Sequence, residues 1–122
     1  MGEAEEAFNV GKEQLVSSKA LYDVGQYRDS ITLSYYAMFS SALSLLLKKN
    51  IYPKTHAGTL RQLAKEYVKT GLLSKENYDS LYDAMELRND SSYNYSRVFT
   101  EDMANELIEE AEKFIAEVET LL

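Results

Sequence analysis

Hydrophobic residues recur at intervals of three and four along most of the chain, which predicts helices and no convincing strand. The pattern indicates five helical segments, at about residues 3–24, 27–49, 56–70, 75–88 and 101–122. No internal repeat, low-complexity tract or domain linker interrupts them. The predicted fold is therefore all-α: a single domain over residues 1–122, built as an antiparallel bundle of about five helices with short connections.

Turn and capping residues mark the expected ends of these segments. Gly25 is a C-terminal stop for the first helix, and Pro53 places residues 50–55 in a loop. Thr55 and Ser74 are suited to cap the third and fourth helices, because their hydroxyls can accept hydrogen bonds from free backbone N–H groups.

The second segment is apolar on two sides, which is typical of a helix packed on two sides. One face carries Ile31, Tyr35, Met38, Ala42 and Leu45, and the roughly opposite face carries Leu33, Tyr36, Leu43 and Leu47. The remaining sector holds only the small residues Ser34, Ala37, Ser41 and Ser44. We expect this to be the central helix, with another helix of the same chain approaching closely along the small sector.

The amino-acid composition excludes several kinds of functional site. The chain has 122 residues, a net charge of −7, no cysteine and one histidine. These counts exclude disulfides, thiolate metal sites and histidine metal centres, so no metal and no cofactor are expected. The acidic total argues against nonspecific DNA coating, although bases between Lys48 and Lys69 leave room for a local basic surface. With no apolar run of membrane-spanning length and no signal peptide, the expected location is the cytoplasm, away from any membrane.

Charged, amide, hydroxyl and phenol groups crowd together in the segment from Arg88 to Tyr95. The guanidinium of Arg88 is a permanent cation whose planar donors suit a phosphate, and Asn89 can donate and accept. On a continuous helix Arg88 and Tyr93 point about 140° apart, so they act together only if the helix ends between them or two chains supply them. The simpler alternatives are an ion pair of Arg88 with a nearby acid, and helix-end packing for Tyr93 and Tyr95.

Three parts of the sequence, in this order and spacing, resemble the HEPN domains of small prokaryotic proteins. They are Tyr35-Tyr36-Ala37-Met38-Phe39, the loop Pro53-Lys54-Thr55-His56 followed by Gly58, and Leu87-Arg88-Asn89-Asp90-Ser91-Ser92-Tyr93. The HEPN signature is an arginine followed after four to six residues by a histidine. Tyr93 stands where the shortest spacing would put that histidine.

The resemblance implies a helical bundle that forms a homodimer, with the motif helices of two copies lining a shared cleft. In active HEPN ribonucleases the arginine binds phosphate, and the histidine acts on the 2′-hydroxyl. Many members pair with a small nucleotidyltransferase in toxin–antitoxin modules. In some pairs that enzyme adenylylates a tyrosine two positions beyond the motif histidine, which corresponds to Tyr95.

The sequence leaves the activity open, because a phenol with an ordinary pKa near 10 is a poor base at neutral pH. The leading hypothesis is the HEPN member of a nucleotidyltransferase-associated module, with an RNA- or nucleotide-facing cleft around Arg88 and with Arg88, Asn89 and Tyr93 as candidate catalytic residues. His56 could supply the missing base only if folding or dimerisation brings it near Arg88. The alternatives are a non-enzymatic interaction or nucleotide-binding subunit, or a likeness of fold alone.

Overall fold

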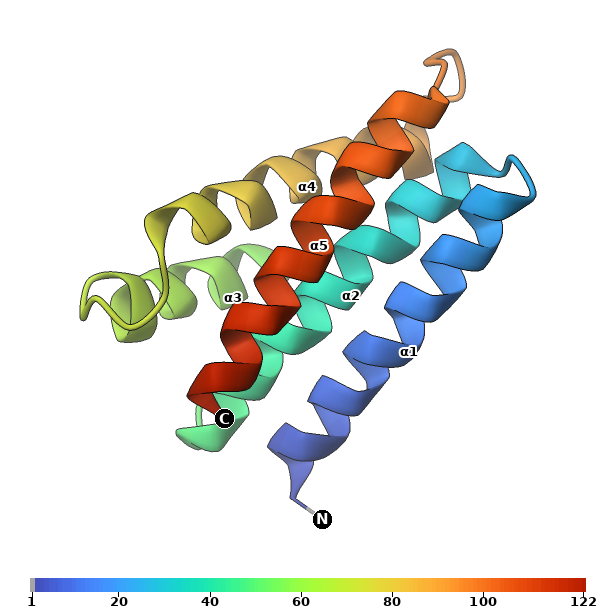
Figure 1. The fold of residues 1–122 in the computed structure, drawn as a ribbon. Helices are drawn as coiled ribbons and strands as arrows, with labels where there is room; N and C mark the ends of the chain where they lie inside the picture. The colour runs from blue at the N-terminus through green and yellow to red at the C-terminus, as the bar shows by residue number, and fades with distance from the viewer. Residues whose placement is uncertain (1) are drawn as a thin grey trace.

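A computed structural model, which describes residues 2–122, contains five α-helices and one π-helical turn. The elements are α1 (Glu3–Asp23), α2 (Tyr27–Lys48), α3 (His56–Leu63), η1 (Ala64–Val68), α4 (Lys75–Tyr93) and α5 (Glu101–Leu121). Residues 2–122 form no strand, so the all-α prediction is confirmed. α1, α2 and α5 lie alongside one another, while α3 and α4 occupy the side away from α1 (Figure 1). α2 and α5 run in the same direction, and α1 runs opposite to both.

The helix ends follow the predicted turn chemistry. The Thr55 hydroxyl accepts a hydrogen bond from the Gly58 N–H at 2.8 Å, and the Ser74 hydroxyl accepts one from the Asn77 N–H at 3.1 Å. Gly25 follows α1 with a φ of +80°, a left-handed conformation that glycine adopts without steric cost. The two predicted N-caps and the predicted C-terminal stop are therefore confirmed.

α2 is the central helix, as expected, and packs against α1, α3, α4 and α5. Its small sector faces α1 closely: a Cβ added at Gly11 would lie 2.8 Å from the Ser41 hydroxyl and 3.0 Å from the Ala37 carbonyl oxygen. Ser18 of α1 donates to the Ser30 carbonyl oxygen at 2.8 Å. Because these hydroxyls find partners inside the interface, the polar small residues are buried without leaving unpaired groups.

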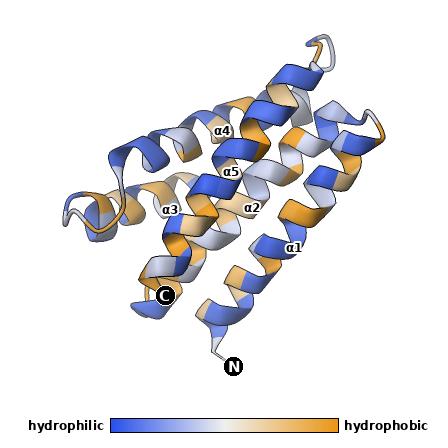
Figure 2. Ribbon diagram, in the orientation of Figure 1, coloured by the Kyte–Doolittle hydropathy of each residue, from blue (hydrophilic) through white to orange (hydrophobic). Residues whose placement is uncertain are grey.

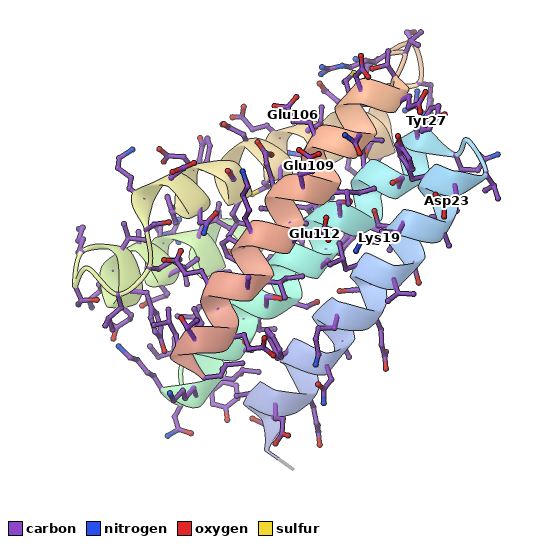
Figure 3. The ribbon with its side chains drawn as sticks, in the orientation of Figure 1. Lys19, Asp23, Tyr27, Glu106, Glu109 and Glu112 are labelled. Carbon is purple, nitrogen blue, oxygen red and sulfur yellow. The ribbon has the colours of Figure 1, made fainter. Side chains whose placement is uncertain are left out.

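α5 covers the bundle with its apolar stripe and turns its acids outward (Figure 2). Figure 3 shows Glu106, Glu109 and Glu112 along this helix, with Lys19 of α1 reaching toward Glu112. Their ion pair spans 2.9 Å and is exposed at both ends, so it adds little to stability. The acids of α5 thus belong to the solvent-facing side of a core-facing helix, as its spacing predicts.

The apolar character of α2 resembles that of a membrane helix. By length and composition alone α2 could cross a membrane, with a mean hydropathy of 1.4 over its most apolar window. However, 61% of that window is buried inside the bundle. Contact with the surrounding helices therefore accounts for its hydrophobicity.

Two elements differ from the expected ranges. The third helix passes at Ala64 into the π-helical turn η1, where the Lys69 N–H donates to the Ala64 carbonyl oxygen at 2.9 Å. That turn carries the buried Tyr67, whose hydroxyl donates to the Leu45 carbonyl oxygen of α2 at 2.7 Å. α4 extends beyond Arg88 to Tyr93 without a break.

Candidate functional site

Three helices bring an arginine, a histidine and a tyrosine together. Tyr35 lies in α2, His56 is the first residue of α3, and Arg88 lies in the last two turns of α4. The Tyr35 hydroxyl is 2.7 Å from His56 Nδ1, and Arg88 Nη2 is 3.2 Å from the same nitrogen. We call these three residues the Arg–His–Tyr cluster.

Aromatic rings hold the imidazole in place. Phe39 stacks on the His56 ring with 4.2 Å between centroids, and Tyr36 meets it edge-on at 6.1 Å. The capping hydrogen bond of Thr55 fixes the backbone just before His56. The imidazole therefore has little freedom to rotate, which is what a functional group held in one orientation requires.

The surroundings of His56 favour its neutral form. Burial lowers the pKa of His56 below its ordinary value of 6.5, and the nearby charge of Arg88 lowers it further. The position at the N-terminal end of α3 acts in the same direction, because the helix dipole is positive there. At neutral pH the imidazole is uncharged and is chemically able to exchange a proton.

Arg88 has an unneutralised charge. Its guanidinium lies over the rings of Tyr35 and Tyr36, at 5.2 and 5.5 Å, and makes no ion pair within residues 2–122. Its Nε is buried and has no hydrogen-bond partner in the described chain. Asp90 pairs with Arg97 instead, so the proposed ion pair between Arg88 and a neighbouring acid is wrong. A cation with spare donors is suited to an anion such as a phosphate.

The other motif residues lie apart from this cluster. α4 is continuous through Tyr93, so the expected helix end between Arg88 and Tyr93 is absent, and one chain does not bring the two side chains together. Tyr93 is 71% exposed and Tyr95 is 86% exposed, which excludes helix-end packing as the role of either ring. Asn89 is also exposed.

Arg28 organises the segment after the motif, and the sequence analysis missed it. Its guanidinium donates to three carbonyl oxygens, those of Ser91 at 2.9 Å, Asn94 at 3.1 Å and Arg97 at 2.6 Å. Arg28 and Tyr35 are seven residues apart in α2 and so share a face. The spacing of seven residues was visible in the sequence. In the structure this one face of α2 contacts the end of α4 through Arg28 and contacts His56 through Tyr35.

The surface near the motif is hollowed on the other side of α4. A groove between α4 and α5 has a volume of about 260 Å³ and is lined in part by Asp83, Leu87, Glu106 and Glu110. A larger hollow of about 440 Å³ lies between the start of α1 and the end of α5. Arg88 lines neither hollow; in the Arg–His–Tyr cluster Tyr35 is fully buried and His56 and Arg88 are half-buried. Within residues 2–122, no three acidic or histidine side chains are grouped to hold a metal ion.

Comparison with known proteins shows the family of this chain. Residues 4–121 match the family described as "HEPN domain". The chain belongs to the HEPN family. It is 32% identical to "Putative toxin MJ0605" of Methanocaldococcus jannaschii over 120 residues, covering 98% of this chain and 89% of that protein. It is 30% identical to "Putative toxin MJ0142" of the same organism, covering 93% of this chain and 77% of that protein.

A solved structure shares the fold of this HEPN protein. The crystal structure of TT1696 from Thermus thermophilus superimposes with a TM-score of 0.85 over 100% of both chains. The two sequences are only 16% identical, so the likeness establishes the helical arrangement alone.

Proposed function

We propose that this HEPN protein is the toxin-like member of a two-component module and acts on RNA through Arg88 and His56. The observation that supports this most is the 3.2 Å contact between Arg88 Nη2 and His56 Nδ1. It brings an imidazole from a helix start 32 residues away to the arginine whose own motif lacks one. Two relatives that bear the name of a toxin support the toxin-like role.

The chemistry of such a site is metal-independent cleavage of a phosphodiester. The 2′-hydroxyl attacks the adjacent phosphorus and loses its proton, while the 5′-oxygen leaves and gains one. Arg88 would bind the phosphate and stabilise its growing negative charge. His56 would take the proton of the 2′-hydroxyl, and a water molecule would supply the proton that the 5′-oxygen gains. Tyr93 has the reduced role of an exposed side chain that a second copy could bring to the site.

RNA cleavage in the presence of a chelator tests this function. Arg88→Ala and His56→Asn should each reduce cleavage by about a hundredfold or more, the usual contribution of a general base or of a charge-stabilising group. Lys113→Ala, which removes an exposed cation of α5, is the control and should leave cleavage unchanged. Full activity of both cluster variants would overturn the assignment.

A binding subunit is the second candidate function, and the feature that favours it is the unpaired cation of Arg88. In that case the folded wild type binds RNA or a nucleotide and does not cleave it. Binding should then be weak and salt-sensitive, because few bases on this acidic surface can reach phosphates. Arg88→Ala should weaken binding more than Lys113→Ala, and equal effects would remove Arg88 from the site.

The proposed partner is a small nucleotidyltransferase, with Tyr95 as its target. Tyr95 is 86% exposed and lies just beyond α4, where an enzyme can reach it. Incubation with such an enzyme and ATP should add one adenylyl group to the wild type. Tyr95→Phe should abolish the mass increase, whereas Tyr93→Phe should retain it; labelling that survives Tyr95→Phe would assign another residue.

A further inference from the structure

The Tyr35 hydroxyl makes one contact, with His56, that core packing does not explain. Tyr35 is fully buried, and its ring lies within the core. Its hydroxyl nevertheless ends 2.7 Å from His56 Nδ1, so the phenol joins the hydrophobic core to the imidazole. Burial raises the pKa of Tyr35 to about 12, which keeps the phenol protonated and able both to donate and to accept.

The two neighbours of His56 Nδ1 decide where the ring carries its proton. A guanidinium can only donate, and Arg88 Nη2 lies 3.2 Å from Nδ1. A proton on Nδ1 would face the Arg88 N–H, so Nδ1 must be the acceptor and Nε2 must carry the proton. Nε2 has no hydrogen-bond partner within residues 2–122 and is not among the buried unpaired atoms, so it reaches solvent.

In this tautomer His56 cannot act as a base in the ligand-free site. The solvent-facing Nε2 already holds a proton and cannot accept one. The lone pair that could act as a base is on Nδ1, where Tyr35 and Arg88 cover it. The Arg–His–Tyr cluster therefore needs a change before His56 can serve the function proposed above.

We infer that Tyr35 is the positioning residue of a substrate-gated base: when a phosphate draws Arg88 away from His56, Tyr35 accepts a hydrogen bond from Nδ1 and Nε2 becomes the free base. Nε2 releases its proton to water and Nδ1 takes one from water, so charge and atoms balance and no bond to carbon changes. Tyr35 can make this exchange because a hydroxyl reverses its role, which Arg88 cannot do. The catalytic step rests on the proposed function, but the tautomer change does not.

The shift is partial, because the buried phenol loses its own acceptor when it begins to accept. Removing the Arg88 contact should raise the ratio of the Nδ1–H form to the Nε2–H form by about two- to tenfold, the effect of one net hydrogen bond. Without the Tyr35 hydroxyl, an Nδ1–H group would have no acceptor at that point, so the shift should disappear.

Nitrogen NMR of the imidazole tests the inference. Because the chain has one histidine, both ring signals belong to His56, and only Nδ1 and Nε2 must be told apart, by their couplings to the ring protons. In the ¹⁵N-labelled wild type, Nε2 should be the protonated nitrogen. Arg88→Ala should show more of the Nδ1–H form without any ligand. A 2′-deoxyoligonucleotide, which offers phosphates and cannot be cleaved, should move the wild type and Lys113→Ala in the same direction, while Tyr35→Phe should stay in the Nε2–H form.

Three outcomes would overturn the inference of a substrate-gated base. They are an Nδ1–H form in the free wild type, an unchanged tautomer in folded Arg88→Ala, or an equal response of Tyr35→Phe to the oligonucleotide. The Arg88→Ala measurement needs neither ligand binding nor the Tyr35 variant, so poor folding of Tyr35→Phe leaves the test intact. A tautomer shift without RNA cleavage would support the substrate-gated base and refute the ribonuclease function. RNA cleavage without a tautomer shift would support the ribonuclease function and refute the substrate-gated base.

Discussion

His56 is the residue whose titration reports most directly on the site. We expect Arg88→Ala to raise the pKa of His56 toward its ordinary value of 6.5, because the substitution removes a nearby positive charge and lets water approach the ring. An NMR pH titration of the single imidazole measures this directly. Arg61→Ala, which removes an exposed arginine of the same helix as His56, is the control. A fall in the pKa after Arg88→Ala would contradict the placement of the guanidinium.

The residues of the site were predictable to different degrees. Arg88 follows from its chemistry and its place in the motif, and His56 follows only from being the sole imidazole. Their contact joins residues 32 apart in different helices, and periodicity along one helix carries no information about such a pair. Tyr35 looks like an ordinary core aromatic in the sequence, because its buried ring hides the role of its hydroxyl.

At the scale of elements, the closest helix contact is that of α1 with α2. We expect Gly11→Ala to destabilise the protein by about 1 kcal/mol, the net of two opposing effects. Overpacking against the Ala37 carbonyl and the Ser41 hydroxyl costs about 1–3 kcal/mol, and the better helix propensity of alanine returns up to about 1 kcal/mol. Chemical denaturation measures the difference. Gly2→Ala adds the same methyl group at the N-cap of α1, where nothing lies within 4 Å of a Cβ, so it shows the effect of the substitution without overpacking.

Arg28 should hold the connection between α4 and α5 in its observed shape. Arg28→Ala leaves the carbonyls of Ser91, Asn94 and Arg97 without their charged donor, a loss of about 1–3 kcal/mol. We expect faster amide hydrogen exchange at residues 94–97, with little change in α1. Arg28→Lys should not restore protection, because an ammonium lacks the planar fork that serves several acceptors. Unchanged exchange in Arg28→Ala would mean that the connection is held by its own turn.

The elements themselves were largely predictable, for physical reasons that differ between them. Caps such as Thr55 and Ser74 act through local hydrogen bonds that the sequence alone specifies. The π-helical turn η1 was not predictable, because it arises where Tyr67 reaches the Leu45 carbonyl in another helix. The weak helix formers Asp90 to Ser92 suggested an early end of α4. Tertiary contacts override that propensity: Ser91 is buried, and its hydroxyl pairs with Thr32 at 2.7 Å.

At the scale of the whole molecule, large side chains at and just beyond the end of α4, the helix that also carries Arg88, have no partner within residues 2–122. Tyr93, Tyr95 and Val98 are 71%, 86% and 77% exposed, although Arg28 fixes the backbone that carries them. A fixed loop that displays apolar groups is typical of a contact surface. A second copy placed there would cover these groups and would lie against the end of α4, the helix that carries Arg88.

We therefore expect a homodimer with this end of α4 at or beside the interface. Light scattering at high micromolar concentration should give twice the mass of the 122-residue chain. Tyr95→Asp should weaken association by about tenfold or more, because it replaces an aromatic contact with a charge that must lose its water. Val16→Asp is the control, since Val16 is also exposed, at 68%, but lies in α1. If the dimer forms elsewhere, Tyr95→Asp will leave it intact. In that event the cluster must act within a single chain, and RNA cleavage will not depend on protein concentration.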